Sequence, residues 1–171
     1  IDLGFWHKIV EVNLWGAVYG CKYVYPIMVE QGFGHIINVA SLGGLIPGGP
    51  YTPYSATKHA VVGFSLSLRA EAKQYGINVT ALCPGYINTN IQKSTPNFSA
   101  YLDTEKSRKM SGSFTGPEKY IPQMIRGILK NQAVVISPRM HKVFWWLYRI
   151  SPPLLPALTH KMIGYLKKNR G

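Results

Sequence analysis

Two kinds of apolar pattern alternate along this 171-residue sequence. Between residues 5 and 30, apolar side chains recur at mixed spacings of two to five, which predicts a long, largely buried helix that Gly32 and Gly34 end. The segment HIINVAS, residues 35–41, is instead short, apolar and β-branched, with glycines nearby on both sides. This second pattern predicts a strand that is buried on both faces.

The same alternation continues toward the C-terminus. A helix is expected from about 53 to 75, and the segment INVTALCPG (77–85) repeats the buried-strand pattern. After a long, partly helical loop over 86–115, the capping sequence TGPE predicts a helix from about 116 to 130, and AVVISP predicts a third strand. Strands that alternate with covering helices predict an α/β fold with a doubly wound parallel sheet.

The charge of the chain is strongly basic and unevenly placed. Nineteen Lys and Arg against seven Asp and Glu give a net charge of +12, and no acidic residue follows Glu118. Such an excess suits an acidic partner, namely nucleic acid, anionic lipid or a phosphorylated cofactor. Nucleic acid is not an expected partner, because no aromatic and basic platform of a known binding module accompanies the charge.

Cysteine and histidine usage does not indicate a disulfide framework or a metal site. Cys21 and Cys83 are far apart in sequence and lie beside no histidine cluster, so we expect reduced, buried thiols and no bound metal. No signal-peptide pattern opens the sequence, and Arg149 and three prolines interrupt the longest apolar stretch near its end. We therefore expect a cytoplasmic protein without a transmembrane helix, and peripheral membrane association stays open.

Chemistry is indicated by Tyr54 and Lys58, which fall four residues apart on one face of a predicted helix. An ammonium held near a phenol favours the phenolate, so we expect a lowered pKa for Tyr54, suited to acid or base catalysis. Ser41 closes a strand at the carboxyl edge of the sheet, where ligands of open α/β folds bind. Its hydroxyl could meet Tyr54 over one substrate oxygen.

With these residues the chain resembles the short-chain dehydrogenase/reductase family. The matching segments are NLWG (13–16), GHIINVAS (34–41), YSATK (54–58), GINVTALCPGYINT (76–89) and the TGPE helix start. The resemblance covers about residues 1–138 and implies a Rossmann-like catalytic domain. It fades in residues 139–171, whose own composition predicts a basic, aromatic, helical extension.

The resemblance also implies roles for single residues. Tyr54 would be the general acid in ketone reduction and the general base in alcohol oxidation, while Ser41 would orient the substrate oxygen. Lys58 would hold the cofactor ribose, and Asn13 would bend its helix locally and hold a water that links Lys58 to solvent. The residues expected around the nicotinamide are Tyr54, Lys58, Pro84, Gly85, Ile87 and Thr89.

Two segments of the family pattern are absent from this sequence. Neither the Gly-rich cofactor turn nor the Asn-Asn-Ala-Gly segment occurs, and GGLIPGG (43–49) has the spacing of neither phosphate-binding motif. We therefore expect an incomplete fold that lacks the N-terminal βαβ half, with one flank of the sheet uncovered. The choice between NAD and NADP is normally made in that half, so it stays open.

The expected function is that of an NAD(P)-dependent oxidoreductase that interconverts a secondary alcohol and a ketone. The aromatic extension suggests a lipophilic small-molecule substrate, and a homo-oligomer is expected for the complete protein. Residues 139–171 could form a lid or oligomer contact, an amphipathic anchor on anionic lipid, or a disordered tail. The alternatives are a catalytically incompetent fragment and a membrane-peripheral binding protein that keeps a dehydrogenase remnant.

Overall fold

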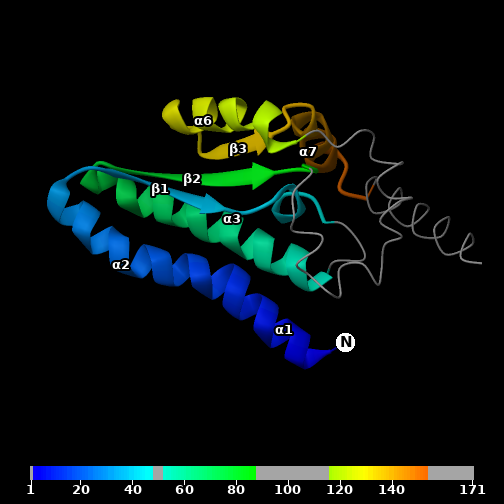
Figure 1. The fold of residues 1–171 in the computed structure, drawn as a ribbon, viewed down its shortest axis with the longest axis horizontal. Helices are drawn as coiled ribbons and strands as arrows, with labels where there is room; N and C mark the ends of the chain where they lie inside the picture. Colours follow the sequence, from blue (N-terminus) through cyan, green and yellow to red (C-terminus); the bar gives the residue numbers. More distant parts are fainter. Residues whose placement is uncertain (1, 48–51, 88–115, 154–171) are drawn as a thin grey trace, which may run out of the picture.

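A computed structural model describes residues 2–47, 52–87 and 116–153 of the chain (Figure 1). The helices and strands over these residues are α1 (Leu3–Val10), a π-helical turn (Glu11–Trp15), α2 (Gly16–Gln31), β1 (Gly34–Val39), α3 (Thr52–Ala72), β2 (Ile77–Pro84), α6 (Ile121–Leu129), β3 (Val134–Ser137) and α7 (His141–Ile150). The predicted order of helices and strands is thereby confirmed up to residue 153, while residues 88–115 of the expected loop and 154–171 of the expected extension lie outside the described residues. The helix expected from 116 begins as a 3-10 turn at Pro117–Lys119, and its α-helical part follows only from Ile121, with proline in its first turn.

The three strands form one parallel sheet in the order β1-β2-β3. Gly34 at the start of β1 pairs with Ile77 at the start of β2, and Pro84 at the end of β2 pairs with Ser137 at the end of β3. The carboxyl ends of the three parallel strands therefore lie at the same edge of the sheet. Figure 1 shows α2 and α3 on one side of the sheet and α6 on the other. This arrangement confirms the α/β, Rossmann-like class, with a sheet whose β1 edge has no strand partner among the described residues.

The core lies between the sheet and the helices α2 and α3. One cluster joins α3 to the carboxyl half of the strands and includes Val61, Ala81 and Cys83. A second cluster joins α2 and α3 to the amino half and includes Cys21 and Ile77. Together the two clusters fix α3 along the length of β2, and this placement sets the position of every side chain that α3 carries.

The strand β1 differs from the sequence prediction, because it is buried on one face only. Ile36 and Asn38 point toward α2 and α3 and are buried, whereas Ile37 and Val39 on the other face are exposed. The helix α6 covers the sheet from above β3 and leaves β1 open on that side (Figure 1). A β-branched, apolar segment predicts a strand, but how many of its faces are buried depends on which helices reach it.

Candidate active site

Ser41 and Tyr54 meet beyond the carboxyl end of β1. The Ser41 side chain caps the short 3-10 turn Leu42–Gly44, because its Oγ accepts a hydrogen bond of 3.1 Å from the Gly43 amide. The turn packs against α3, and Ser55 Oγ of that helix donates to the Gly43 carbonyl at 2.8 Å. The Ser41 hydroxyl and the Tyr54 ring both lie beside Gly43, and Ser41 is near enough to the phenol to act on its pKa. Two of the predicted residues therefore lie close together at the sheet edge where ligands of such folds bind.

Lys58 lies one helical turn beyond Tyr54, as predicted. Its Nζ donates a hydrogen bond of 2.9 Å to the carbonyl oxygen of Val39 and lies 5.9 Å from the centre of the Tyr54 ring. Burial lowers the pKa of Lys58. It also raises the pKa of Tyr54, a rise that the nearby Ser41 side chain opposes and Cys83 reinforces. The expected lowering of the Tyr54 pKa is wrong for this structure, because burial of the phenol outweighs its polar contacts.

Asn13 lies in the π-helical turn between α1 and α2, at the place where a local helix distortion was expected. Its Nδ2 donates to Thr57 Oγ1 at 3.1 Å, and that hydroxyl donates in turn to the Tyr54 carbonyl at 2.9 Å. The amide of Asn13 is therefore connected through one hydroxyl to the backbone of Tyr54. Short π-helical segments are rare and recur at functional sites.

The carboxyl end of β2 brings Pro84, Gly85 and Ile87 to the same edge of the sheet, while Thr89 lies outside the described residues. The Gly85 amide donates to the Ser137 carbonyl at 2.7 Å, which extends the pairing with β3 by one residue. A side chain at Gly85 would collide with the imidazole of His141. Glycine is therefore required here for the close approach of a neighbouring ring.

Sequence reasoning missed His141, which looks isolated in the sequence. The side chain is buried, and the rings of Tyr86 and Phe144 lie 6.2 and 6.1 Å from it. Its Nδ1 has no hydrogen-bond partner among the described residues. Burial lowers the pKa of this imidazole. No sequence signal could have found it, because the contact with Gly85 depends on where α7 packs.

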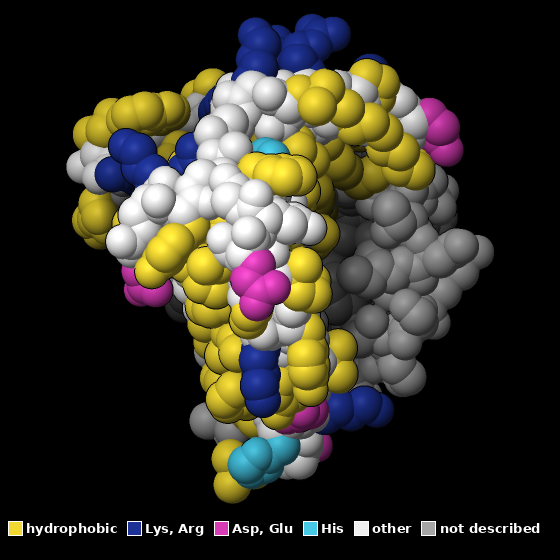
Figure 2. Space-filling view, turned by 90° about the vertical axis from the view of Figure 1, so that its left-hand side faces the viewer, with side chains coloured by type: hydrophobic (Ala, Val, Ile, Leu, Met, Phe, Trp, Pro, Cys, Tyr) yellow, Lys and Arg dark blue, Asp and Glu magenta, His cyan; other side chains and the backbone are white. Residues whose placement is uncertain are grey.

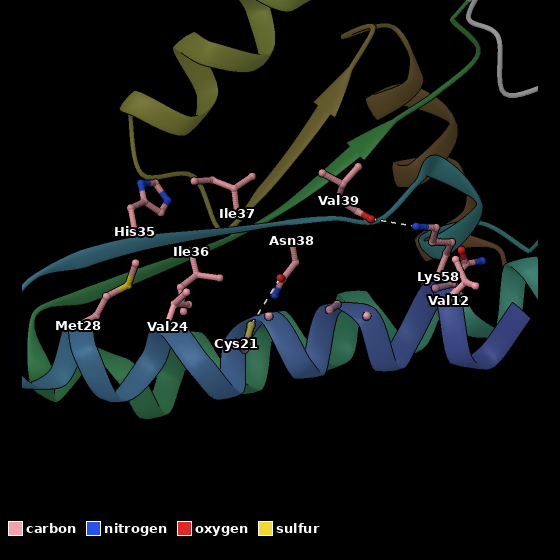
Figure 3. Close-up of a pocket in the computed structure, with 14 residues that line it drawn as sticks. Val12, Cys21, Val24, Met28, His35, Ile36, Ile37, Asn38, Val39 and Lys58 are labelled. Atoms are coloured by element: carbon pink, nitrogen blue, oxygen red, sulfur yellow. Dashed lines mark hydrogen bonds between the residues drawn. The ribbon is translucent and has the colours of Figure 1, made fainter.

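An open groove of about 520 Å³ runs between α2 and the outer edge of β1 (Figure 3). Asn13 and Lys58 line it near the catalytic end of β1, and Met28 and His35 line it at the amino end. Gly16, Ala17 and Gly20 form part of its helical wall. In Figure 3, side chains of α2 point up toward β1, and the dashed line from Lys58 to Val39 marks one end of the groove. The side chain of Lys58 is thus accessible from this groove.

This geometry can bind and protonate a single oxygen atom. A phenol and a hydroxyl that lie close together can both bond one carbonyl or alcohol oxygen, and an ammonium lies beside them. Within the described part of the chain, no three His, Cys, Asp or Glu side chains come together in a way that could hold a metal ion.

Comparison with known proteins identifies the family that the chain resembles. A family model described as short chain dehydrogenase matches residues 1–99. The "Dehydrogenase/reductase SDR family protein 7-like" of Drosophila melanogaster is 33% identical over 152 residues, which cover 86% of this chain and 45% of that relative.

Solved structures agree with this similarity. A gluconate 5-dehydrogenase from Burkholderia cenocepacia J2315 in complex with NADP and tartrate is 31% identical, with a TM-score of 0.52 over 59% of this chain and 41% of that chain. A variant of actinorhodin polyketide ketoreductase with NADPH is 28% identical, with a TM-score of 0.63 over 80% of this chain and 59% of that chain. The chain spans about half the length of these relatives.

Proposed function

The chain belongs to the short-chain dehydrogenase family, and from this premise we propose that it interconverts a secondary alcohol and a ketone as part of an NAD(P)-dependent oxidoreductase. The proximity of Ser41 to Tyr54, with Lys58 one turn away, is the observation that carries the proposal. Asn13 completes the catalytic set through its link to the Tyr54 backbone.

In the reductive direction Tyr54 is the proton donor. Burial raises the pKa of its phenol above the ordinary value of 10.0, so the group is protonated at neutral pH and able to donate to a carbonyl oxygen. The Ser41 hydroxyl bonds the same oxygen and holds it in line with the phenol. When bound, the nicotinamide cofactor supplies the hydride in this direction and accepts it in the other.

The residues present fit one end of such a cofactor. An ammonium offers three donors and Lys58 directs one of them to the Val39 carbonyl, so donors are available for ribose hydroxyls. Pro84, Gly85 and Ile87 follow the adjacent strand, where the nicotinamide would bind. We propose NAD or NADP as the cofactor, since the two solved relatives contain NADP and NADPH. No Gly-rich phosphate turn is present in the sequence to hold the rest of it.

The test is Tyr54→Phe in the intact protein, assayed with NADPH and NADH against a panel of lipophilic ketones. Loss of the phenolic proton donor is expected to lower turnover by about 10²–10⁴-fold, without a change in melting temperature. Tyr75→Phe, on the 3-10 turn after α3, is the matched control and is expected to keep full turnover. Turnover that survives Tyr54→Phe would rule out the proposed mechanism.

The position of α7 supports the proposal that the substrate is lipophilic. His141 at its first position packs against Gly85, so the aromatic side chains of α7 begin next to the proposed nicotinamide site. Apolar and aromatic walls with a few polar groups are typical of sites for small apolar ligands. Steroid-, retinoid- or long-chain-type ketones are therefore the first members of the panel.

Self-association is the second part of the proposal. Trp15 at the end of the π-helical turn and Tyr19, Tyr23 and Ile27 of α2 are exposed on the side that faces away from the sheet. Figure 2 shows hydrophobic side chains gathered along the lower part of the molecule, where α1 and α2 lie. Exposed apolar surfaces of this kind mark protein contacts. We expect Tyr23→Glu to reduce the mass of the assembly in light scattering, and Leu129→Glu on α6 to leave it unchanged.

A second candidate function is a membrane-peripheral binding protein that retains the dehydrogenase fold without turnover. The observation that favours it is the exposed apolar face of α7. Cofactor binding without turnover on any ketone of the panel, together with membrane attachment, would support this candidate over the enzyme.

A further inference from the structure

The helix α7 carries apolar side chains on the side that faces away from the protein. Its inner side is formed by His141, Trp145 and Tyr148, which are buried or half-buried, and Trp145 packs against the core. The exposed apolar residues are Met140 just before the helix and Val143, Phe144, Trp146, Leu147 and Ile150 within it, with 43–78% of each side chain exposed. At 100° per residue these positions form one continuous face opposite the inner side. A helix on the surface of a soluble domain ordinarily presents polar residues there.

The charged residues around this face are all basic. Lys142 and Arg149 lie seven residues apart on the same flank of the helix, and Arg139 precedes it. The guanidinium of Arg149 lies 5.2 Å from the Trp145 ring and 5.8 Å from the Trp146 ring. An apolar face bordered by cations and indole rings is complementary to the surface of an anionic bilayer, where acyl chains lie below negative headgroups.

The length of α7 determines how it could contact a bilayer. Ten residues extend over about 15 Å, half of the roughly 30 Å of a hydrocarbon core. No helix in the described ranges is long and apolar enough to cross a membrane. The helix would therefore lie in the plane of the interface.

A second copy of the chain is a poorer occupant of this face. In a two-fold contact the same patch meets itself, so the cations of one α7 would face those of the other. The sequence after Glu118 contains no acidic residue that could pair with them. A further strand paired with the open edge of β1 would not cover this face either, because α7 packs beside β3 at the opposite edge of the sheet (Figure 1).

We propose that α7 is an in-plane docking helix for anionic membranes, with Phe144, Leu147 and Ile150 below the headgroups and Lys142 and Arg149 among them. Docking by itself is independent of the proposed reaction. A further consequence rests on that reaction: because His141 joins α7 to Gly85, docking holds the carboxyl edge of the sheet at the bilayer, from which a lipophilic substrate could enter.

The test is co-sedimentation of the intact protein with vesicles of phosphatidylcholine alone and of equal parts phosphatidylcholine and phosphatidylserine. Leu147→Ser with Ile150→Ser is expected to lower the partition coefficient at least about tenfold. The matched control is Ile125→Ser with Leu129→Ser on α6, which changes side chains of similar exposure, 50% and 80% against 43% and 78%. This control pair is expected to bind vesicles like the unaltered protein.

Charge is tested separately with Lys142→Gln and Arg149→Gln. At about 1 kcal/mol per cation near an anionic surface, the pair should reduce the preference for phosphatidylserine vesicles by about thirtyfold. The proposal is overturned if the unaltered protein does not bind the anionic vesicles, or if the α7 pairs bind as well as the α6 pair. Turnover on a water-soluble ketone, measured on the same variants, separates the two proposals: retained vesicle binding without turnover would count against the reaction alone.

Discussion

The side-chain ammonium of Lys58 donates a hydrogen bond of 2.9 Å to the backbone carbonyl of Val39, at the outer edge of β1 (Figure 3). The lysine proposed to hold the cofactor is therefore positioned by a backbone carbonyl of the strand. Burial lowers the pKa of Lys58, and the nearby Cys83 opposes this shift only in part.

This relationship predicts that Lys58→Met separates stability from activity. Methionine fills a similar volume and removes both the partly buried charge and its hydrogen bond, so the two effects on folding oppose each other. We expect the free energy of unfolding to change by no more than about 1 kcal/mol, measured by urea denaturation. Binding of NADPH, followed by nicotinamide fluorescence, should weaken at least tenfold. Unchanged NADPH affinity in Lys58→Met would contradict the assignment of Lys58 to the cofactor.

Substitution of glycine by alanine is expected to change stability in opposite directions at Gly44, which faces α3, and at Gly63, which lies within α3. An added methyl at Gly44 would collide with the backbone carbonyl of Lys58, which cannot move without the helix. Gly44→Ala should therefore cost about 1–3 kcal/mol of stability and displace Lys58, with loss of turnover. At the exposed Gly63 the added methyl would meet no described heavy atom within 4 Å apart from its own helix backbone, so Gly63→Ala should stabilise by about 0.5–1 kcal/mol. Equal melting temperatures for the two variants would show that the turn does not press on α3.

Burial of His141 predicts a loss of stability in mild acid. Its pKa is lowered from 6.5 in the fold, so the unfolded chain takes up a proton at a higher pH than the folded chain. The stability that the neutral imidazole contributes is present above about pH 6.5 and is lost as the pH falls toward its folded pKa. The pKa of His35 is lowered in the same direction, by burial first and by Arg69 second, and adds to the effect.

The measurement is the urea midpoint at a series of pH values between neutral and mildly acidic. His141→Phe should flatten the dependence on pH, because it removes one group that protonates more readily in the unfolded state. His7→Phe, on the exposed surface of α1, controls for the loss of a histidine. Profiles of identical slope for the unaltered protein and His141→Phe would mean that His141 is not the group responsible.

Local patterns in the sequence were sufficient to predict the elements and the meeting of Ser41, Tyr54 and Lys58. A spacing of four residues on a helix and the position of a serine at a strand end are geometric consequences of short segments. The distortion around Asn13 was expected only from the family resemblance, and the structure places it in the π-helical turn.

Properties that depend on distant packing could not be predicted. The direction of the Tyr54 pKa follows from how deeply α3 buries the phenol, and no spacing encodes that depth. The exposure of Ile37 follows from the reach of α6, and the contact of His141 with Gly85 follows from the placement of α7. Each of these three properties can be predicted only once two or more helices or strands have been placed relative to one another.

Because both cysteines are buried, we expect that thiol reagents do not modify the folded protein. Both thiols are buried, and burial raises the pKa of Cys83 to about 12, so its thiolate fraction at pH 8 is only about 10⁻⁴. Burial likewise raises the pKa of Cys21, although the hydrogen bond to Asn38 opposes the rise. Cys83 is fully buried in the core cluster beside α3, and the Ser41 backbone is near enough to its sulfur to act on its pKa. A reagent could reach it only after the structure around Ser41 had opened.

Reaction with a chromogenic disulfide at pH 8 checks this. Native protein should release chromophore only at the rate of its own unfolding, and urea-unfolded protein should react at once with both thiols. Cys21→Ser keeps a donor for Asn38 and leaves Cys83 as the single reporter. Its slow phase should lengthen further when NADPH is added, since a ligand that binds the folded state suppresses opening of the turn beside Ser41. Rapid modification of Cys83 in the native variant would instead show that the turn opens readily and that Ser41 is not held against Tyr54.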